Sequence, residues 1–342
     1  MRPFFFRAFV LFLCVAVNAA AWFSLYVYTS VPGDYESIAK EVTVVIPKGA
    51  GVRQIKQILA KQGVIRDDFR FLILVRLLKD GKQLRAGEFK IPLGMTPLQV
   101  LRFLSTAKPV QYRVTIPEGW TMEQVAEAFA RDGWVDPEKF LQICRDKEFI
   151  RQLGIRADSL EGYLFPETYT LVRGEVDEKS LVRTMVNRFL KVWDGLDKPA
   201  ELSLNRHQLV TLASIVEKET GSAGERARIA GVFYNRLNKG MRLQSDPTTI
   251  YGLKDFNGNL TRADLKMETP YNTYVISGLP PGPICNPGRA ALQAVLLPEK
   301  VPYYYFVSKN DGSHHFSTTL KEHNHAVYSF QKRPQAAKPA KE

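Results

Sequence analysis

The apolar residues follow different patterns in successive parts of the chain. Residues 8–28, "AFVLFLCVAVNAAAWFSLYVY", carry no charged side chain. As a helix rising about 1.5 Å per residue, they would span the roughly 30 Å hydrocarbon core of a bilayer. Arg2 and Arg7 precede the run, and basic residues favour the cytoplasmic side. The pattern predicts a single-pass anchor at 8–28 in the inner (cytoplasmic) membrane, with residues 1–7 in the cytoplasm and the remainder outside it.

A cleaved signal peptide is the alternative, because Ala19, Ala20 and Ala21 supply the small residues of a cleavage site. The apolar run continues past them, which favours an uncleaved anchor. Polar residues at 29–41 predict a stalk, and residues 332–342 have the composition of a disordered tail.

A pattern of strand and helix then occurs twice. "VTVVIPKGAGVRQIKQILAKQGVI" (42–65) is matched by "YRVTIPEGWTMEQVAEAFARDGWV" (112–135), with Ile-Pro-x-Gly in both copies. Each copy predicts a strand, a Pro/Gly turn and a helix whose apolar residues recur every three or four positions. Between the copies, residues 87–108 repeat the turn before another helix. The unit at 42–110 resembles LysM-type glycan-binding modules, although a spacer between the membrane and the rest of the chain would fit equally well.

Residues 111–331 are mainly helical in pattern, with long loops. Amphipathic helices are predicted at about 178–193 and 204–222. Ser222 and Glu225 have capping-box spacing, which predicts the start of the next helix. The loops that follow are rich in Tyr, Asn, Pro and Gly, and such loops often carry binding residues. The predicted fold class is therefore α+β: a transmembrane helix, a small LysM-like α/β module, and a mainly helical, loop-rich domain with short strands.

Composition and charge restrict the partners. The fractions of hydrophobic (45%) and charged (24%) residues are typical of a globular protein. The net charge is +12, which suits an anionic partner. Because the anchor predicts export, that partner would belong to the cell wall or the membrane surface and would not be nucleic acid. Cys144 and Cys285 are the two cysteines outside the anchor, too few for a disulfide framework or a four-cysteine zinc site. A single bridge between them stays open.

The string "LASIVEKETGS" (212–222) places two glutamates near the end of a predicted helix. At about 100° per residue, Glu217 and Glu219 diverge by about 200°, so they cannot hold one ligand together. The Glu219 side chain would lean back over Ile215 and Val216. Apolar surroundings and the negative end of the helix dipole both raise the pKa of a carboxyl group. Glu219 is therefore predicted to act as a general acid; the alternative is that both glutamates are solvated helix-end residues.

The wider pattern resembles a known family. "LASIVEKET", "GVFYNRL", "MRLQSDPTTIYG", "LTRADL", "YNTYVISGLPPGPI" and "HFS" have the order and spacing of YceG-like endolytic murein transglycosylases. The resemblance covers nearly all of the chain after the anchor and is densest from 160 to 325. It implies a YceG-like catalytic domain at 111–331 that cleaves the β-1,4 bond between N-acetylmuramic acid and N-acetylglucosamine within peptidoglycan strands. It also implies 1,6-anhydro product ends, a role in terminating nascent strands, and penicillin-binding proteins or other wall synthases as candidate partners.

The resemblance maps the catalytic acid of the family onto Glu219, with the Thr220 hydroxyl as an orienting hydrogen-bond partner and Glu217 in a supporting role. The acid would protonate the leaving oxygen and then, as a base, help the sugar's own 6-hydroxyl to attack the anomeric carbon. Because the nucleophile belongs to the substrate, its proximity is built in. A second carboxylate, which glycoside hydrolases require, is then unnecessary, and no cofactor is expected.

The candidate substrate-binding residues are polar and aromatic residues in the loops: Gln244, Ser245, Asp246, Tyr271, Asn272 and Tyr274. The first three lie where a loop returns and offer groups for sugar hydroxyls, although Asp246-Pro247 would also suit an Asx-type turn. The other three offer stacking faces and an amide suited to N-acetyl sugars, or would pack in the core.

Two other functions fit parts of the pattern. A non-catalytic peptidoglycan-binding scaffold would work without Glu219. A pyridoxal-type lyase would need a Schiff-base lysine and a phosphate-binding pocket, but the sequence has no Gly-rich phosphate loop. The histidines at 314, 315, 323 and 325 suggest a metal site, but transglycosylation needs no metal and none is predicted.

Overall fold

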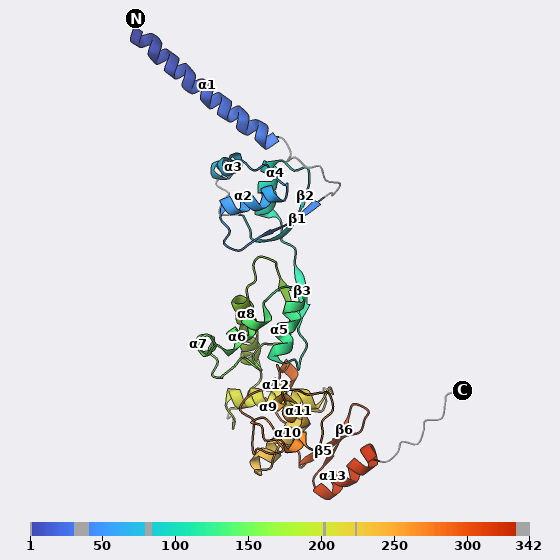
Figure 1. Ribbon diagram of the computed structural model, residues 1–342. Coiled ribbons are helices and arrows are strands. Elements are labelled where there is room, and N and C mark those ends of the chain that lie inside the picture. The colour runs from blue at the N-terminus through green and yellow to red at the C-terminus, as the bar shows by residue number, and fades with distance from the viewer. Residues whose placement is uncertain (1, 31–40, 79–83, 201–202, 223, 333–342) are drawn as a thin grey trace, which may run out of the picture. The chain divides into compact units, whose positions relative to one another are not determined.

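The chain forms two compact units (Figure 1). The computed structural model describes residues 2–30, 41–78, 84–200, 203–222 and 224–332. Unit 1 contains Met1–Val114 and Thr170–Val176, and unit 2 contains Thr115–Tyr169 and Asp177–Glu342. Residues 31–40 of the predicted stalk and residues 333–342 of the predicted tail lie outside the described residues.

Unit 1 begins with the long helix α1 (Arg2–Ser30). Its segment Phe5–Thr29 is long and apolar enough to cross a membrane, although a signal sequence would pass the same test of length and composition. The helix is unbroken through Ala19–Ala21. Most of its side chains are exposed, but Tyr28, near its end, is buried in the core of unit 1.

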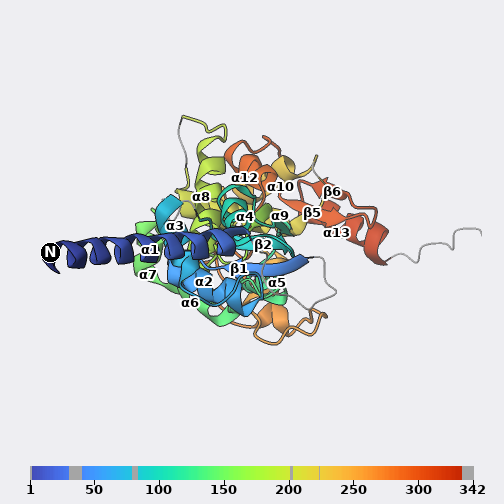
Figure 2. The ribbon, with the colours of Figure 1, turned by 90° about the horizontal axis from the view of Figure 1, so that it is seen from above.

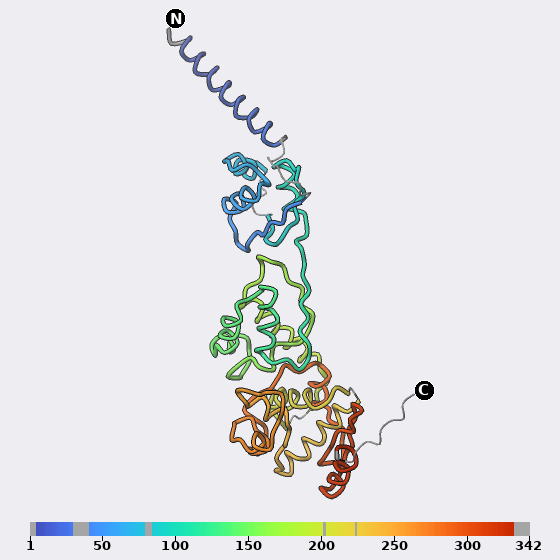
Figure 3. Tube along the Cα trace, turned by 45° about the vertical axis from the view of Figure 1, so that its right-hand side comes forward, coloured from blue at the N-terminus to red at the C-terminus, as the bar shows by residue number. Residues whose placement is uncertain are grey.

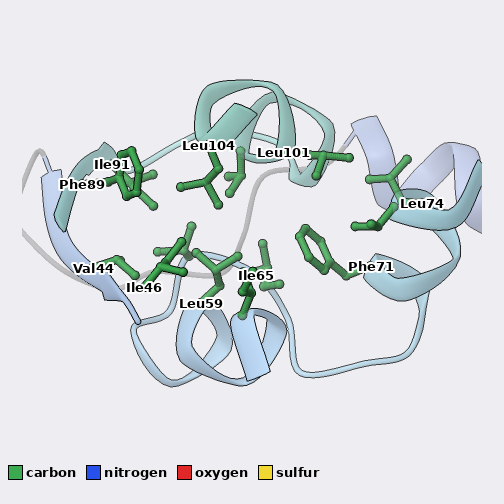
Figure 4. Close-up of a cluster of buried hydrophobic side chains, with 14 of the residues drawn as sticks. Val44, Ile46, Leu59, Ile65, Phe71, Leu74, Phe89, Ile91, Leu101 and Leu104 are labelled. Atoms are coloured by element: carbon green, nitrogen blue, oxygen red, sulfur yellow. The ribbon is translucent and has the colours of Figure 1, made fainter. Parts of the chain in front are cut away.

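The rest of unit 1 is a two-stranded sheet packed against three helices. Strand β1 (Glu41–Ile46) pairs antiparallel with β2 (Gly87–Pro92). Apolar side chains from both strands and the helices meet in one core (Figure 4). The helices are α2 (Val52–Lys61), α3 (Arg70–Leu78) and α4 (Pro97–Thr106). The strand and helix predicted at 42–65 and the helix predicted within 87–108 are therefore confirmed, and α3 is an additional helix between them.

The internal repeat is visible in the backbone. Gly49, Gly94 and Gly119 end the three Ile-Pro-x-Gly turns, and their φ angles are 79°, 102° and 79°. These values lie in the left-handed region, which glycine adopts without the steric cost that other residues meet. The repeated motif therefore encodes one type of turn, which reverses the chain between a strand and the helix that follows it.

The chain leaves unit 1 along β3 (Tyr112–Thr115) and returns along its partner β4 (Thr168–Leu171). Residues 170–176 then add to unit 1, where the Lys48 amide donates to the Gly174 carbonyl at 2.6 Å. The sequence pattern predicted a single domain boundary near residue 110 and did not predict that a later segment belongs to unit 1. Four helices belong to this part of unit 2: α5 (Met122–Arg131), α6 (Pro137–Arg145), α7 (Lys147–Gln152) and α8 (Glu178–Asp194).

The remainder of unit 2 is built around helix α9 (Arg206–Glu219), which packs against α10, α11 and α12. Figures 2 and 3 show the C-terminal hairpin and α13 beside α10. The further elements are α10 (Arg226–Asn238), α11 (Asp246–Gly252), the 3-10 turn η2 (Asp264–Lys266), α12 (Arg289–Leu296), β5 (Tyr305–Ser308), β6 (His314–Ser317), α13 (Leu320–Val327) and the π-helical turn η3 (Tyr328–Lys332).

Helix α9 is the central element of this part. Asn205 caps its start in a capping box with Gln208. Four apolar residues of one face of the helix are fully buried: Leu209, Leu212, Ala213 and Val216. A helix covered on nearly every side by other elements is held firmly in place, so the side chains at its last turn have fixed positions.

One predicted helix start is wrong. Ser222 and Glu225 do not form a capping box, because α10 begins at Arg226 and Glu225 makes no side-chain cap. The Glu225 carboxylate instead accepts hydrogen bonds from the backbone amide and ring Nδ1 of His314, at 3.0 and 2.7 Å. A tertiary contact has therefore replaced a local one.

The two cysteines of unit 2 are free. Cys144 and Cys285 are both buried, and burial raises the pKa of each thiol. The Cys285 thiol donates to the Ser214 carbonyl at 3.3 Å. The bridge that the sequence left open is not formed.

Candidate active site

Glu219 ends helix α9 and lines a cavity of about 690 Å³. Protein atoms surround its carboxyl group on most sides, and one side opens to the cavity, so the residue is partly buried. The Ser245 hydroxyl donates a hydrogen bond to Glu219 Oε1 at 2.5 Å. The carboxyl group is therefore held in one orientation and is still accessible to a ligand.

The surroundings of Glu219 favour its protonated form. Burial raises the pKa of this carboxyl from 4.5 to about 7, and the negative charge of Asp246 acts in the same direction. The Ser245 hydrogen bond and the Arg236 cation lower the pKa, but by less than burial raises it. A raised pKa keeps a proton on this carboxyl closer to neutral pH, as a general acid requires. The pKa increase predicted from the helical wheel is confirmed.

Glu217 points elsewhere, as its position on the wheel predicted. Its carboxylate accepts a hydrogen bond from the Gly288 amide at 2.9 Å and lies 3.5 Å from the Arg226 guanidinium. Only 6% of the Glu217 side chain is exposed. These contacts join the end of α9 to the starts of α10 and α12, so Glu217 has a structural role and does not line the cavity.

Residues 244–246 bring two further predicted residues to the cavity, Gln244 and Asp246. Gln244 has a φ of 47°, a conformation that is costly for a residue with a side chain and that recurs at active sites and ligand clamps. Asp246 begins helix α11, so the Asx-type turn considered from the sequence is replaced by a helix start. Its Oδ1 accepts a hydrogen bond from the Tyr274 hydroxyl at 2.6 Å, and Tyr274 also lines the cavity.

The residue that orients Glu219 is not the one predicted. Thr220 lines the cavity, but its hydroxyl accepts a hydrogen bond from the Ser222 amide at 2.9 Å. This bond stabilises the turn that follows α9 and does not reach Glu219. Ser245, which was predicted to bind sugar, is buried and donates to Glu219. The orienting hydroxyl therefore comes from a loop distant in sequence and not from the neighbouring residue.

Asn272 does not offer its amide to a ligand. The side chain is fully buried, and its nitrogen donates to three backbone carbonyls, the closest being Met267 at 2.7 Å. Its oxygen accepts from the Thr249 hydroxyl and the Tyr274 amide. The expected sugar-binding amide is thus fully occupied in holding the loop that carries Tyr274.

Tyr271 lines a different hollow of about 620 Å³. The hollow also contains His207, Arg151 and Arg156. His207 is twelve residues before Glu219 on α9, which corresponds to about 18 Å along the helix. Tyr271 is not among the residues that line the cavity of Glu219.

The C-terminal hairpin and α13 supply a large part of the cavity wall, and the sequence pattern gave little sign of this. His314 and Asn324 line the cavity, and the His323 ring stacks on Tyr305 with centroids 5.3 Å apart. Arg236 from α10 also lines it, and its guanidinium donates to two backbone carbonyls, those of Leu243 and Tyr304. The signal was present only in the family-like string "HFS" (315–317) and the histidines around it.

The histidines are engaged separately. His314 pairs with Glu225, whereas His323 stacks on Tyr305. Within the described parts of the chain, no three His, Cys, Asp or Glu side chains are placed to share a metal ion.

Comparison with known proteins agrees with these motifs. Residues 44–329 match the YceG-like family. The chain is 33% identical to an endolytic murein transglycosylase of Bacillus subtilis, over 84% of each protein. It is 30% identical to one of Streptococcus pneumoniae, over 94% of this chain and 64% of that protein. The crystal structure of a YceG-like protein from Listeria monocytogenes matches 84% of the chain and 98% of its own, with 34% identity and a TM-score of 0.58. The chain belongs to the YceG-like family.

Proposed function

We propose that this protein is a membrane-anchored lytic transglycosylase that cleaves peptidoglycan glycan strands internally. The observation that carries the proposal is Glu219, a firmly oriented carboxyl group with a pKa of about 7 that opens into a large cavity. The B. subtilis and S. pneumoniae relatives, which are named endolytic murein transglycosylases, supply the substrate. The bond cleaved would be the β-1,4 bond between N-acetylmuramic acid and N-acetylglucosamine.

In the first step, protonated Glu219 donates its proton to the glycosidic oxygen while the bond from that oxygen to the anomeric carbon breaks. The resulting carboxylate is stabilised by the Ser245 hydroxyl and the nearby Arg236 cation. In the second step, the carboxylate takes the proton of the 6-hydroxyl of the muramic acid residue as that oxygen bonds to the anomeric carbon. The product end is a 1,6-anhydro sugar, and Glu219 is protonated again, so one carboxyl group serves as both acid and base.

The sugar-binding roles divide between two places. Gln244, Asp246 and Tyr274 would contact the sugars on either side of the bond, because all three line the cavity with Glu219. Tyr271 would contact another part of the strand, since it lines a separate hollow and not the cavity of Glu219. Ser245 is assigned to orienting Glu219.

Hydrolysis is the second candidate reaction, and the position of Asp246 favours it. This carboxylate lines the same cavity as Glu219 and is close enough to raise its pKa. Glycoside hydrolases pair an acid with such a second carboxylate, which activates water or attacks the sugar. The two reactions differ in the source of the new oxygen at the product end.

The test is digestion of purified peptidoglycan in water enriched in oxygen-18, with the products analysed by mass spectrometry. Transglycosylation gives anhydro ends without label, lighter than the hydrolytic product by one water. Hydrolysis gives labelled reducing ends and would require a second carboxylate, for which Asp246 in the same cavity is the candidate. No cleavage at all would support the non-catalytic scaffold.

We propose further that the anchor has its N-terminus in the cytoplasm and holds the catalytic unit outside the inner membrane, where it terminates nascent strands. The uncharged run after Arg2 and Arg7 supports this orientation. A reporter fused after residue 342 would then be active outside the cytoplasm. Penicillin-binding proteins would be captured by crosslinking in cells if they are partners. The LysM-like part of unit 1 would add glycan binding, which should weaken as salt screens its charges.

A further inference from the structure

Helix α3 is apolar on two opposite faces. Phe71, Leu74 and Val75 are buried in the core of unit 1. Phe69, directly before the helix, is 68% exposed, and Ile73 and Leu77 are 40% and 50% exposed. A helix at the surface of a soluble domain normally has a polar outer face. A helix with apolar residues on its outer face as well indicates that another surface covers that face.

The exposed face of α3 adjoins the outer end of the candidate membrane span. Phe69, Ile73 and Leu77 are spaced four residues apart, so they form one stripe along the helix. Together with Trp22 and Leu25 of α1, this stripe lines an apolar groove of about 250 Å³. Figure 2 shows α3 next to α1 in the same unit.

The length of α1 indicates how deep in the bilayer the groove would lie. A bilayer core of roughly 30 Å takes about 20 helical residues. Counted from Ala8, the first residue after Arg7, these residues end near Val27. Trp22 and Leu25 would therefore lie in the outer part of the bilayer, and side chains that line a groove with them are held at a similar depth.

The polar groups around the stripe suit the lipid headgroup region. The Arg70 guanidinium lies 4.5 Å from the ring centroid of Tyr28 and forms an ion pair with Asp68. Arg66 is close enough to Tyr28 to influence its hydroxyl, and Arg76 is an exposed cation on α3. Arginine and tyrosine are enriched where a membrane protein meets headgroups and phosphates.

We propose that the stripe Phe69, Ile73 and Leu77 is inserted into the outer leaflet of the membrane, so that unit 1 rests on the lipid surface and is not suspended from α1. This inference rests on the proposed anchor. It assigns α3 a function that glycan cleavage does not require: limiting how far the catalytic unit can move from the membrane surface.

The experiment uses the full chain with Cys14→Ser, in vesicles of phosphatidylethanolamine and phosphatidylglycerol that carry lipid-bound spin labels. Cys144 and Cys285 are buried, so a fluorescent NBD group can be attached selectively at Leu77→Cys. Lys61→Cys, an exposed position on α2, is the control outside the membrane. Phe12→Cys, exposed in the middle of α1, is the control inside it.

We expect shallow spin labels to quench the fluorescence at position 77 about twofold or more, and position 61 hardly at all, because interfacial helices lie near the acyl–headgroup boundary. If position 77 behaves like position 61 while position 12 is quenched by deep labels, the anchor holds and the insertion of α3 is refuted. If position 12 is not quenched either, the anchor itself is absent, and this proposal fails with it. Phe69→Cys, which alters a residue that is mostly exposed, repeats the test at the other end of the stripe.

Discussion

Replacing Glu219 by Gln should make the protein more stable and nearly inactive. The amide still accepts the Ser245 hydrogen bond, but it cannot donate and recover a proton. General acid–base catalysis contributes about 10²–10⁴-fold to a rate. Strand cleavage should therefore fall by at least about 100-fold, while the variant still folds and binds glycan.

The gain in stability follows from the pKa of Glu219. The folded protein binds this proton more tightly than the unfolded chain, because the pKa rises from 4.5 to about 7 on folding. Stability is then lost as pH rises from about 4.5 to about 7, and the loss is complete above that. A difference of about 2.5 pKa units corresponds to about 3 kcal/mol. Glu219→Gln removes this cost, so it should be more stable than the parent protein at pH 8 by about 2–3 kcal/mol and nearly equal to it at pH 4.5.

Thermal unfolding in detergent at both pH values measures the effect, and a gain of this size corresponds to roughly 4–12 °C for a unit of this length. Glu217→Gln is the matched control two residues away. It weakens the pair with Arg226 at 3.5 Å and should lower stability at both pH values while most activity remains. The reasoning is refuted if Glu219→Gln keeps more than a tenth of the activity, or if Glu217→Gln is the inactive variant.

Four further changes test Glu219's neighbours and the loops that carry the predicted sugar-binding residues. Ser245→Ala removes a hydrogen bond that lowers the pKa of Glu219, so the fall of kcat/KM with rising pH should move to higher pH. Asp246→Asn removes a charge that raises the same pKa and should move that fall to lower pH; equal shifts in one direction would contradict the assignment. Tyr271→Ala should raise KM for long strands severalfold and leave kcat unchanged, because Tyr271 lines a hollow separate from the cavity of Glu219; a large loss of kcat would place it at the reacting bond. Asn272→Ala leaves several buried partners unsatisfied and should lower the free energy of unfolding by at least about 2 kcal/mol, as measured by chemical denaturation.

Much of the fold follows from local sequence patterns. The strand and helix at 42–65, the repeated Pro-x-Gly turns and helix α8 depend on short-range periodicity and on glycine conformations, which the sequence displays directly. The pKa of Glu219 could also be predicted, because on a buried helix the wheel position and the helix end together define the surroundings of a side chain. The divergence of Glu217 from Glu219 has the same origin.

Tertiary structure alone decided which groups surround Glu219. Ser245 reaches it from a loop 26 residues away in sequence, and no local pattern records such a contact. The same holds for Glu225, which has the spacing of a capping box but is hydrogen-bonded to His314 instead. It also holds for Asn272, whose side-chain amide is hydrogen-bonded to backbone groups of its own loop and is not available to a ligand. Sequence periodicity determines which face of an element is buried, but the partner of a polar side chain depends on how distant segments meet in space.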